Sequence, residues 1–292
     1  MIFVDPYCHA GNILVSADLE TAYQAISDGE QQSKWSTSVK RQVAPDLWVG
    51  ASIVTGRSNY VRFRRDPERR IVDFDFANTP GSMKFISSAR AVPGAAVGYG
   101  DRETILTLHQ WRFASQPSDA LRRVAAEHES EMYRMKALVE HAADPPKDAI
   151  PGGAYAHSSS DLAAVAADVL FDFVSNGEVY GQWTWGRTPR TRIADTTFRC
   201  PSEFGGPDLL LRLDIDHDRR VVDFYVGETA ERMLLQQSAR VFPGPVFDFG
   251  ADNALVTFTQ WRAAAQPAFE WERAIASQEQ ELILTKAVVE RK

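Results

Sequence analysis

Two histidines, His109 and His128, are the side chains of this 292-residue chain best suited to acid–base chemistry at neutral pH. Imidazole titrates near neutrality, so one ring can take a proton from carbon while another delivers a proton to oxygen. Aldol-type ring closure and dehydration need both steps. The alternative interpretation is that each ring is an ordinary core residue whose nitrogens find partners inside the protein.

The chain consists of two similar copies, so each position in one copy can be compared with its counterpart in the other. Residues 27–30 recur at 175–178, which is 148 positions later, and residues 110–112 recur at 260–262, which is 150 positions later. A unit of this length exceeds the roughly 20–50 residues of solenoid and propeller repeats, so we interpret it as a domain duplication. Matched positions that agree are candidates for maintaining the fold, and those that differ are candidates for chemistry.

The two histidines are confined to the first copy. The second copy carries Thr259 in place of His109 and Gln278 in place of His128. Neither replacement exchanges a proton at neutral pH. We therefore predict a candidate catalytic domain at 1–143 and a structural or ligand-holding domain at 154–292. The residues between them, 144–153, are rich in proline and glycine and are predicted to form an exposed linker.

Within each copy the pattern predicts an early helix, a set of strands and a long final helix. Asp18 is a suitable N-cap for the first helix. Two strands, 60–65 and 70–76, flank a turn-forming cluster and are predicted to form a hairpin. Two more strands follow at 83–92 and 104–113. The long helices, about 118–142 and about 268–291, carry apolar residues at three- and four-residue spacing.

The turn predicts a hairpin register, with Arg65 opposite Arg70. That register pairs Val61 with Phe74, Phe63 with Val72 and Arg62 with Asp73, and in the second copy Leu211 with Phe224, Leu213 with Val222 and Arg212 with Asp223. The apolar pairs then share one face. Arg62 and Asp73 are expected on an outer, solvated face together with Arg90, Gln110 and Arg112.

Strand alternation at 104–113 predicts the direction of the catalytic candidates. Thr107, His109 and Trp111 share one face, and Gln110 lies on the other. If the polar face is outward, His109 points toward the long helix, from which His128 points back. Tyr133 lies off the apolar stripe and is expected to be exposed. The matched Glu131 and Glu281 are expected at the surface.

Composition narrows the function classes. The formal net charge is −7, and no basic run stands clear of acidic residues, so nucleic acid is not an expected partner. We find no apolar segment long enough to span a membrane, and no secretory signal, which predicts a cytoplasmic protein. Cys8 and Cys200 occupy unmatched positions, which argues against a repeated disulfide or metal site. No nucleotide or metal cofactor is implied, because phosphate loops and metal-ligand spacings are missing.

The order of elements, with the phrases at 69–74, 88–94 and 131–140, resembles the polyketide cyclase/dehydrase-like branch of the START/Bet v 1-like (SRPBCC) superfamily, in tandem duplication. The resemblance implies an α+β fold of two helix-grip domains, each a curved antiparallel sheet wrapped around a long C-terminal helix with a hydrophobic cavity between them. It also implies a cyclase, aromatase or dehydratase that needs no cofactor. Non-catalytic lipid and hormone binders share the fold.

The leading hypothesis is therefore an enzyme of this type acting on a hydrophobic or aromatic small molecule, such as a polyketide-derived intermediate, with His109 and His128 as catalytic residues. The alternative is a carrier protein for a lipid-like or aromatic metabolite. A third interpretation is a pseudo-dimeric scaffold whose halves pack on each other. Predicted cavity-lining residues are His9, Trp35, Trp48, Phe74, Thr107, Trp111, Met132, Met135, Trp183, Thr259, Trp261 and Gln278.

Overall fold

Each copy folds as a seven-stranded antiparallel sheet with a long helix against one face. The computed structural model describes residues 7–36, 38–52, 58–117, 120–140, 155–184, 190–201 and 207–291. The strand orders are β1-β7-β6-β5-β4-β3-β2 and β8-β14-β13-β12-β11-β10-β9. The two orders match element for element. The predicted α+β class with two tandem helix-grip domains is confirmed, and the predicted linker, 144–153, lies outside the described residues.

The strands and helices of the first copy are β1 (Cys8–Val15), α1 (Leu19–Ser27), α2 (Gly29–Trp35), β2 (Ser38–Ala44), β3 (Leu47–Ser52), β4 (Ser58–Asp66), β5 (Ile71–Ala77), β6 (Lys84–Pro93), β7 (Thr104–Trp111) and α3 (Ala120–Val139). Those of the second copy are β8 (Ala156–Ala163), α4 (Ala167–Ser175), α5 (Tyr180–Trp183), β9 (Thr191–Ala194), β10 (Thr197–Cys200), β11 (Leu209–Asp216), β12 (Val221–Gly227), β13 (Leu234–Pro243), β14 (Ala254–Trp261) and α6 (Ala268–Val289). Short 3₁₀ turns lie at Pro80–Ser82, Gly94–Val97, Ala230–Arg232 and Gly244–Phe247.

The predicted first helix begins at the expected cap. The Asp18 carboxylate accepts a hydrogen bond from the Thr21 backbone N–H at 2.8 Å, which satisfies one of the free donors at the start of α1. The helix buries Ala22, Tyr23 and Ile26 against the sheet. Gly29 then opens a separate short helix, α2, which is capped by Asp28.

A matched glycine lets the second short helix pack tightly on the sheet. A Cβ on Gly29 would lie 2.2 Å from the Trp48 indole, and a Cβ on Gly177 would lie 2.2 Å from the Phe198 ring. Real side chains do not approach this closely, so alanine at either position must displace a buried ring. The same close contact in both copies explains why the glycine is kept.

We expect Gly29→Ala to lower the free energy of unfolding by about 1–3 kcal/mol, because it overpacks a filled core. Urea denaturation followed by tryptophan fluorescence measures the change. Gly81→Ala is the matched control, since a Cβ there meets nothing within 4 Å. Equal midpoints for the two variants would show that Trp48 moves aside without cost.

The hairpin register differs from the prediction by two residues. Phe63 pairs with Phe74 and Arg64 with Asp73, while in the second copy Leu213 pairs with Phe224. The reason lies in the turn, because the Asp66 side chain accepts hydrogen bonds from the backbone N–H groups of Glu68 and Arg69. This closes the hairpin at Asp66, one residue later than predicted. A shift of two preserves parity, so the predicted apolar face is retained.

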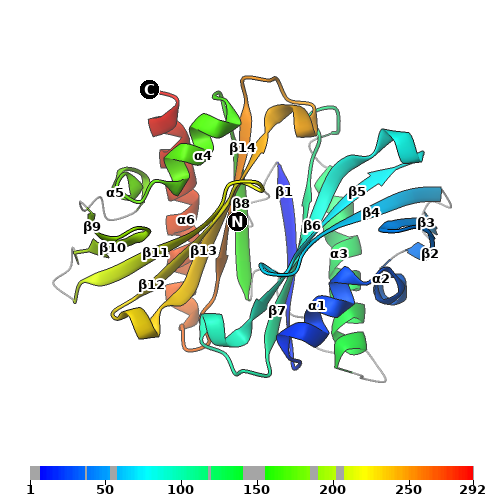
Figure 1. Ribbon diagram of the computed structural model, residues 1–292, viewed down its shortest axis with the longest axis horizontal. Helices are drawn as coiled ribbons and strands as arrows, with labels where there is room; N and C mark the ends of the chain where they lie inside the picture. Colours follow the sequence, from blue (N-terminus) through cyan, green and yellow to red (C-terminus); the bar gives the residue numbers. More distant parts are fainter. Residues whose placement is uncertain are drawn as a thin grey trace.

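The two sheets meet back to back. In Figure 1, β1 and β8 lie in the middle of the molecule and the long helices α3 and α6 lie on opposite sides of it. Trp111 of β7 packs with Phe242 and Phe247 of the second copy, and Trp261 of β14 packs with Val92 and Ile105 of the first. The predicted packing of the two halves against each other is therefore present.

Two reciprocal ion pairs bridge the halves. Arg90 donates to the Asp223 carboxylate at 2.8 and 2.5 Å, and Arg240 donates to the Asp73 carboxylate at 2.8 and 2.7 Å. The prediction of a solvated outer face with an Arg62–Asp73 pair is wrong. Asp73 is only 1% exposed, because the second copy covers that face.

Candidate functional site

His109 lies at the interface between the copies, not beneath the long helix. Its Nε2 is 3.0 Å from the Ser158 hydroxyl and 3.1 Å from the Thr259 hydroxyl, both of the second copy. The prediction that His109 and His128 enter one cavity from opposite walls is therefore wrong. Strand β7 is buried on both faces, so alternation alone does not tell which face meets the helix. Leu106 and Leu108 form the face that meets the helix, since both belong to the core beneath α3.

His128 does face the sheet, and its partner there is His9. The two ring centroids are 5.3 Å apart. Burial lowers the pKa of His128 to about 3 and the pKa of His9 to about 4, so both rings are neutral at pH 7. His128 Nδ1 and His9 Nε2 have no hydrogen-bond partner within the described part of the chain. Gly11 of β1 lies next to this pair, since a Cβ there would be in van der Waals contact with the His128 Cβ at 3.4 Å.

We expect His128 to make the protein sensitive to acid. The folded-state pKa is lowered from 6.5, so between pH 6.5 and pH 3 the unfolded chain binds a proton that the folded chain does not, and stability falls as pH falls. The loss from pH 7 to pH 5 is about 2 kcal/mol for this group. Urea denaturation of wild type and His128→Gln, the residue of the second copy, should show a smaller loss in the variant. Parallel losses would contradict this assignment.

The other predicted lining residues divide among three places. Trp35, Trp48, Phe74, Met132 and Met135 lie in the core beneath α3, and Trp183 lies in the core beneath α6. Trp111, Thr259, Trp261 and Thr107 occupy the face that meets the other copy. Gln278 lies beneath α6, where its amide donates to the Phe258 carbonyl oxygen at 2.8 Å.

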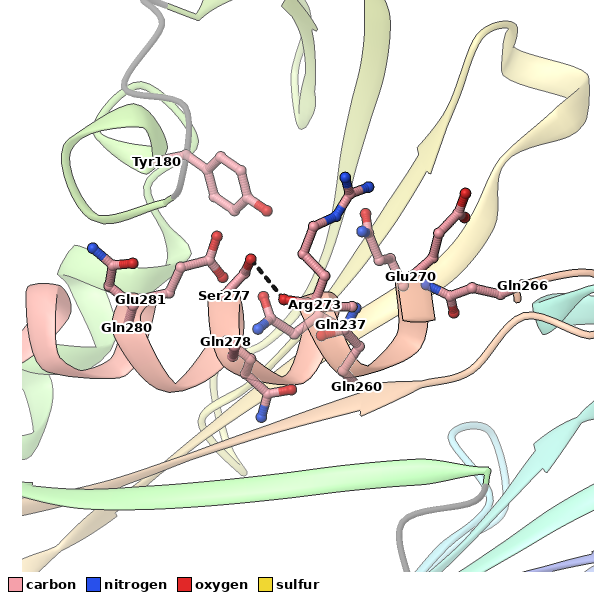
Figure 2. A pocket seen from close by; sticks show the side chains of 13 residues that line it. Tyr180, Gln237, Gln260, Gln266, Glu270, Arg273, Ser277, Gln278, Gln280 and Glu281 are labelled. Atoms are coloured by element: carbon pink, nitrogen blue, oxygen red, sulfur yellow. Dashed lines mark hydrogen bonds between the residues drawn. The ribbon is translucent and has the colours of Figure 1, made fainter. Parts of the chain in front are cut away.

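A pocket of about 570 Å³ lies in the second copy, between the sheet and α6 (Figure 2). Of the residues predicted to line a cavity, only Gln278 lines this pocket, because the prediction favoured histidines and aromatic side chains. Several of its residues differ from their first-copy counterparts, as Tyr180 does from Gln32 and Gln237 from Ser87, and this difference was the available signal. The lining residues are Tyr180, Gln236, Gln237, Gln260, Gln266, Glu270, Arg273, Ala274, Ala276, Ser277, Gln278, Gln280 and Glu281.

The pocket is polar where a hydrophobic cavity was expected. Side-chain amides line its floor from β13 and β14, and Glu270 and Arg273 lie along the first turns of α6 (Figure 2). Amides both donate and accept hydrogen bonds. Such a wall suits a ligand that carries several oxygen atoms on an apolar skeleton.

Tyr180 is the side chain of the pocket whose proton is held most firmly. Burial raises the pKa of its phenol, and the Glu281 carboxylate raises that pKa further. The ring packs edge-on against Trp183 at 4.8 Å, and the Arg190 guanidinium lies 5.4 Å from the ring centroid. The phenol is therefore a fixed hydrogen-bond donor at neutral pH. Figure 2 shows its hydroxyl and the Glu281 carboxylate on the same side of the pocket.

Glu131, the first-copy counterpart of Glu281, is also inside the protein. Only 8% of Glu131 is exposed, so the prediction of a surface residue is wrong. The helix α2 packs against α3, and the Glu131 carboxylate acts electrostatically on the buried Lys40. Tyr133, expected to be exposed, is half-buried against the first core.

Within the residues that the structure describes, no cluster of three or more histidine, cysteine, aspartate or glutamate side chains is arranged to hold a metal ion. Over the same part of the chain, no helix combines the length and the apolar character needed to cross a membrane. Cys8 and Cys200 are both buried and are not joined by a disulfide.

Comparisons with known proteins give fold-level similarities. No protein-family model matches the chain, and no curated protein does. Among solved structures, the di-domain ARO/CYC BexL from the BE-7585A biosynthetic pathway is 14% identical with a TM-score of 0.37, covering 97% of each chain. The di-domain ARO/CYC StfQ from the steffimycin pathway is 9% identical with a TM-score of 0.34, covering 97% of this chain and 98% of its own. The Zhui aromatase/cyclase from Streptomcyes sp. R1128 is 14% identical with a TM-score of 0.32, covering 47% and 98%. Values this low assign no reaction.

Proposed function

We propose that the protein is a cofactor-independent cyclase or dehydratase that acts on a carbonyl-rich, polyketide-like small molecule in the second-copy pocket. The observation that carries the proposal is the buried phenol of Tyr180, held protonated beside the carboxylate of Glu281 in a pocket of about 570 Å³. This moves the acid–base work from the first copy, where the sequence predicted it, to the second.

The two groups divide the chemistry by their protonation states. The Glu281 carboxylate takes a proton from the carbon between two carbonyls, and the Tyr180 hydroxyl donates to the carbonyl oxygen on which negative charge develops. The carbanion attacks a second carbonyl carbon of the same chain and forms the new C–C bond, and the resulting alkoxide takes back the proton held by Glu281. For the dehydration, the regenerated Glu281 carboxylate removes a second carbon proton and delivers it to the departing hydroxyl, which leaves as water.

The pocket size and walls support this substrate class. Pockets for small organic ligands measure about 300–1,000 Å³. Gln237 and Gln260 from the sheet offer side-chain amide donors to further carbonyl oxygens. A pure hydrocarbon would leave these buried amides without partners, which costs free energy. The predicted hydrophobic ligand is therefore refined to one with regularly spaced oxygens.

The test is conversion of linear poly-β-carbonyl thioesters, followed by liquid chromatography and mass spectrometry. We expect products that have lost water and absorb as conjugated rings, formed faster than in buffer alone. Saturable binding without conversion would contradict the enzyme and support the carrier alternative. One observation favours that alternative, namely the many glutamine side chains in the lining, because amides can hydrogen-bond a ligand but do not transfer protons.

A further inference from the structure

The first copy has a buried amine where the second copy has an arginine. Lys40 immediately precedes Arg41 of β2, and Arg190 immediately precedes Thr191 of β9, 150 positions later. The Lys40 ammonium donates to the Ser36 hydroxyl at 2.7 Å, and Arg190 donates to the Thr184 hydroxyl at 3.5 Å. The two cations are thus held in the same way at the end of the short helix.

A carboxylate from the long helix accompanies each cation. Glu131 of α3 acts electrostatically on Lys40, and Glu281 of α6, together with Arg190, acts on Tyr180. Glu131 and Glu281 are matched positions of the duplication. The cluster of cation, hydroxyl and carboxylate is therefore present twice, once beside each long helix.

What stands in front of the cation differs between the copies. In the second copy the Tyr180 ring lines the pocket and Arg190 lies over that ring, so the aromatic side chain lies between the cation and the pocket. In the first copy the matched residue is Gln32, which is 4% exposed and whose Oε1 accepts no hydrogen bond from any described residue. The first copy thus has a buried, unsatisfied hydrogen-bond acceptor at the position where the second copy has a ring, and this acceptor can bind a ligand group.

The surroundings of Lys40 favour its neutral form. Only 9% of Lys40 is exposed, and the hydroxyl that it contacts carries no charge. Burial lowers the pKa of Lys40 to about 8, although Glu131 opposes the shift. Arg134 of α3 donates to the Ser36 carbonyl oxygen at 3.4 Å. About half of the amine is unprotonated at pH 8, against less than about 1% for an ordinary lysine.

We propose that Lys40 is a nucleophilic amine of a second ligand site in the first copy, which captures aldehydes or ketones as an imine. The Nζ lone pair attacks the carbonyl carbon, and the Lys40 proton moves through Glu131 to the oxygen. The carbinolamine then loses water and forms the C=N bond. No oxidant or reductant takes part. The site is separate from the Tyr180 pocket and does not depend on the reaction proposed there.

The experiment is reductive trapping on the full chain. Benzaldehyde and cyanoborohydride are added at pH 8 in limiting amount, and labelled peptides are mapped by mass spectrometry. We expect Lys40 to be labelled at least tenfold faster than Lys84 or Lys34, although Lys84 is 55% exposed. The rate of Lys40 labelling should rise with pH around a midpoint near 8.

Two variants distinguish this proposal from the proposed cyclase or dehydratase function of the Tyr180 pocket. Lys40→Arg keeps the charge, copies the second copy and should abolish the selective label. Tyr180→Phe should leave the label unchanged, even though it impairs the proposed cyclase. Labelling of the exposed lysines with Lys40 unreacted in wild type would overturn the proposal, and this result needs no variant to fold.

Discussion

Tyr180→Phe is expected to lower kcat for cyclisation or dehydration by about 10²–10³-fold, the usual cost of removing one hydrogen-bond donor to a developing oxyanion. The substitution removes one hydroxyl and keeps the ring that packs against Trp183 and Phe224. The fold should therefore survive. Turnover of the poly-β-carbonyl substrate, measured by product formation over time, gives the ratio, and the denaturation midpoint checks the fold.

Tyr225→Phe is the matched control for this variant. Tyr225 is a half-buried tyrosine of β12 with an arginine, Arg212, 4.6 Å from its ring centroid, but it does not line the pocket. Its turnover should equal that of wild type. If Tyr180→Phe retained full activity as a folded protein, the assignment of Tyr180 as the hydrogen-bond donor to the developing oxyanion would be wrong.

Arg240→Ala is expected to lower the free energy of unfolding by about 3–5 kcal/mol, because it leaves a buried carboxylate without its main partner. Asp73 is 1% exposed and receives two hydrogen bonds from Arg240. The remaining cation, Arg64, is 3.6 Å away and is 47% exposed, so it replaces only part of the lost interaction. Urea denaturation measures the effect.

An exposed pair provides the control for this substitution. Arg220 bonds Asp168, which is 79% exposed, so Arg220→Ala should cost at most about 1 kcal/mol. The double variant Arg240→Ala, Asp73→Asn should recover part of the loss, because the buried charge is gone. A single-variant loss no larger than that of Arg220→Ala would show that the interface pairs are fully hydrated.

The same ion pair gives a dependence on pH. Burial alone would raise the pKa of Asp73, but the charge and hydrogen bonds of Arg240 outweigh it and hold that pKa below its ordinary value. The stabilisation is complete above the unfolded-state pKa of about 4 and is lost as pH falls through the folded-state pKa. The difference in free energy of unfolding between wild type and Arg240→Ala should therefore become smaller below pH 4.

The sequence predicted the architecture well because repeated apolar spacing and turn chemistry are local signals. The cap at Asp18, the hairpin around Asp66 and the long α3 all follow from nearby residues. Which face of β7 meets the helix was predicted wrongly. Both faces of that strand are buried, and the second copy that covers one of them is far away in sequence.

The candidate site could be predicted only in part. The sequence singled out Gln278 of α6 and His128 of α3 as residues that face the sheet, and the structure places both there. Tyr180 escaped notice because a tyrosine at the end of a short helix has no motif of its own. Its properties arise from packing, since burial and the Glu281 carboxylate act together on its phenol.

Joining two copies in one chain has let their interiors diverge while the two principal ion pairs between them stayed matched. A homodimer must present each residue twice, so a change in one cavity is copied into the other. Here the interface between the copies keeps two equivalent ion pairs, Arg90 with Asp223 and Arg240 with Asp73. The interiors are free to specialise, with tyrosine and arginine on one side and glutamine and lysine on the other.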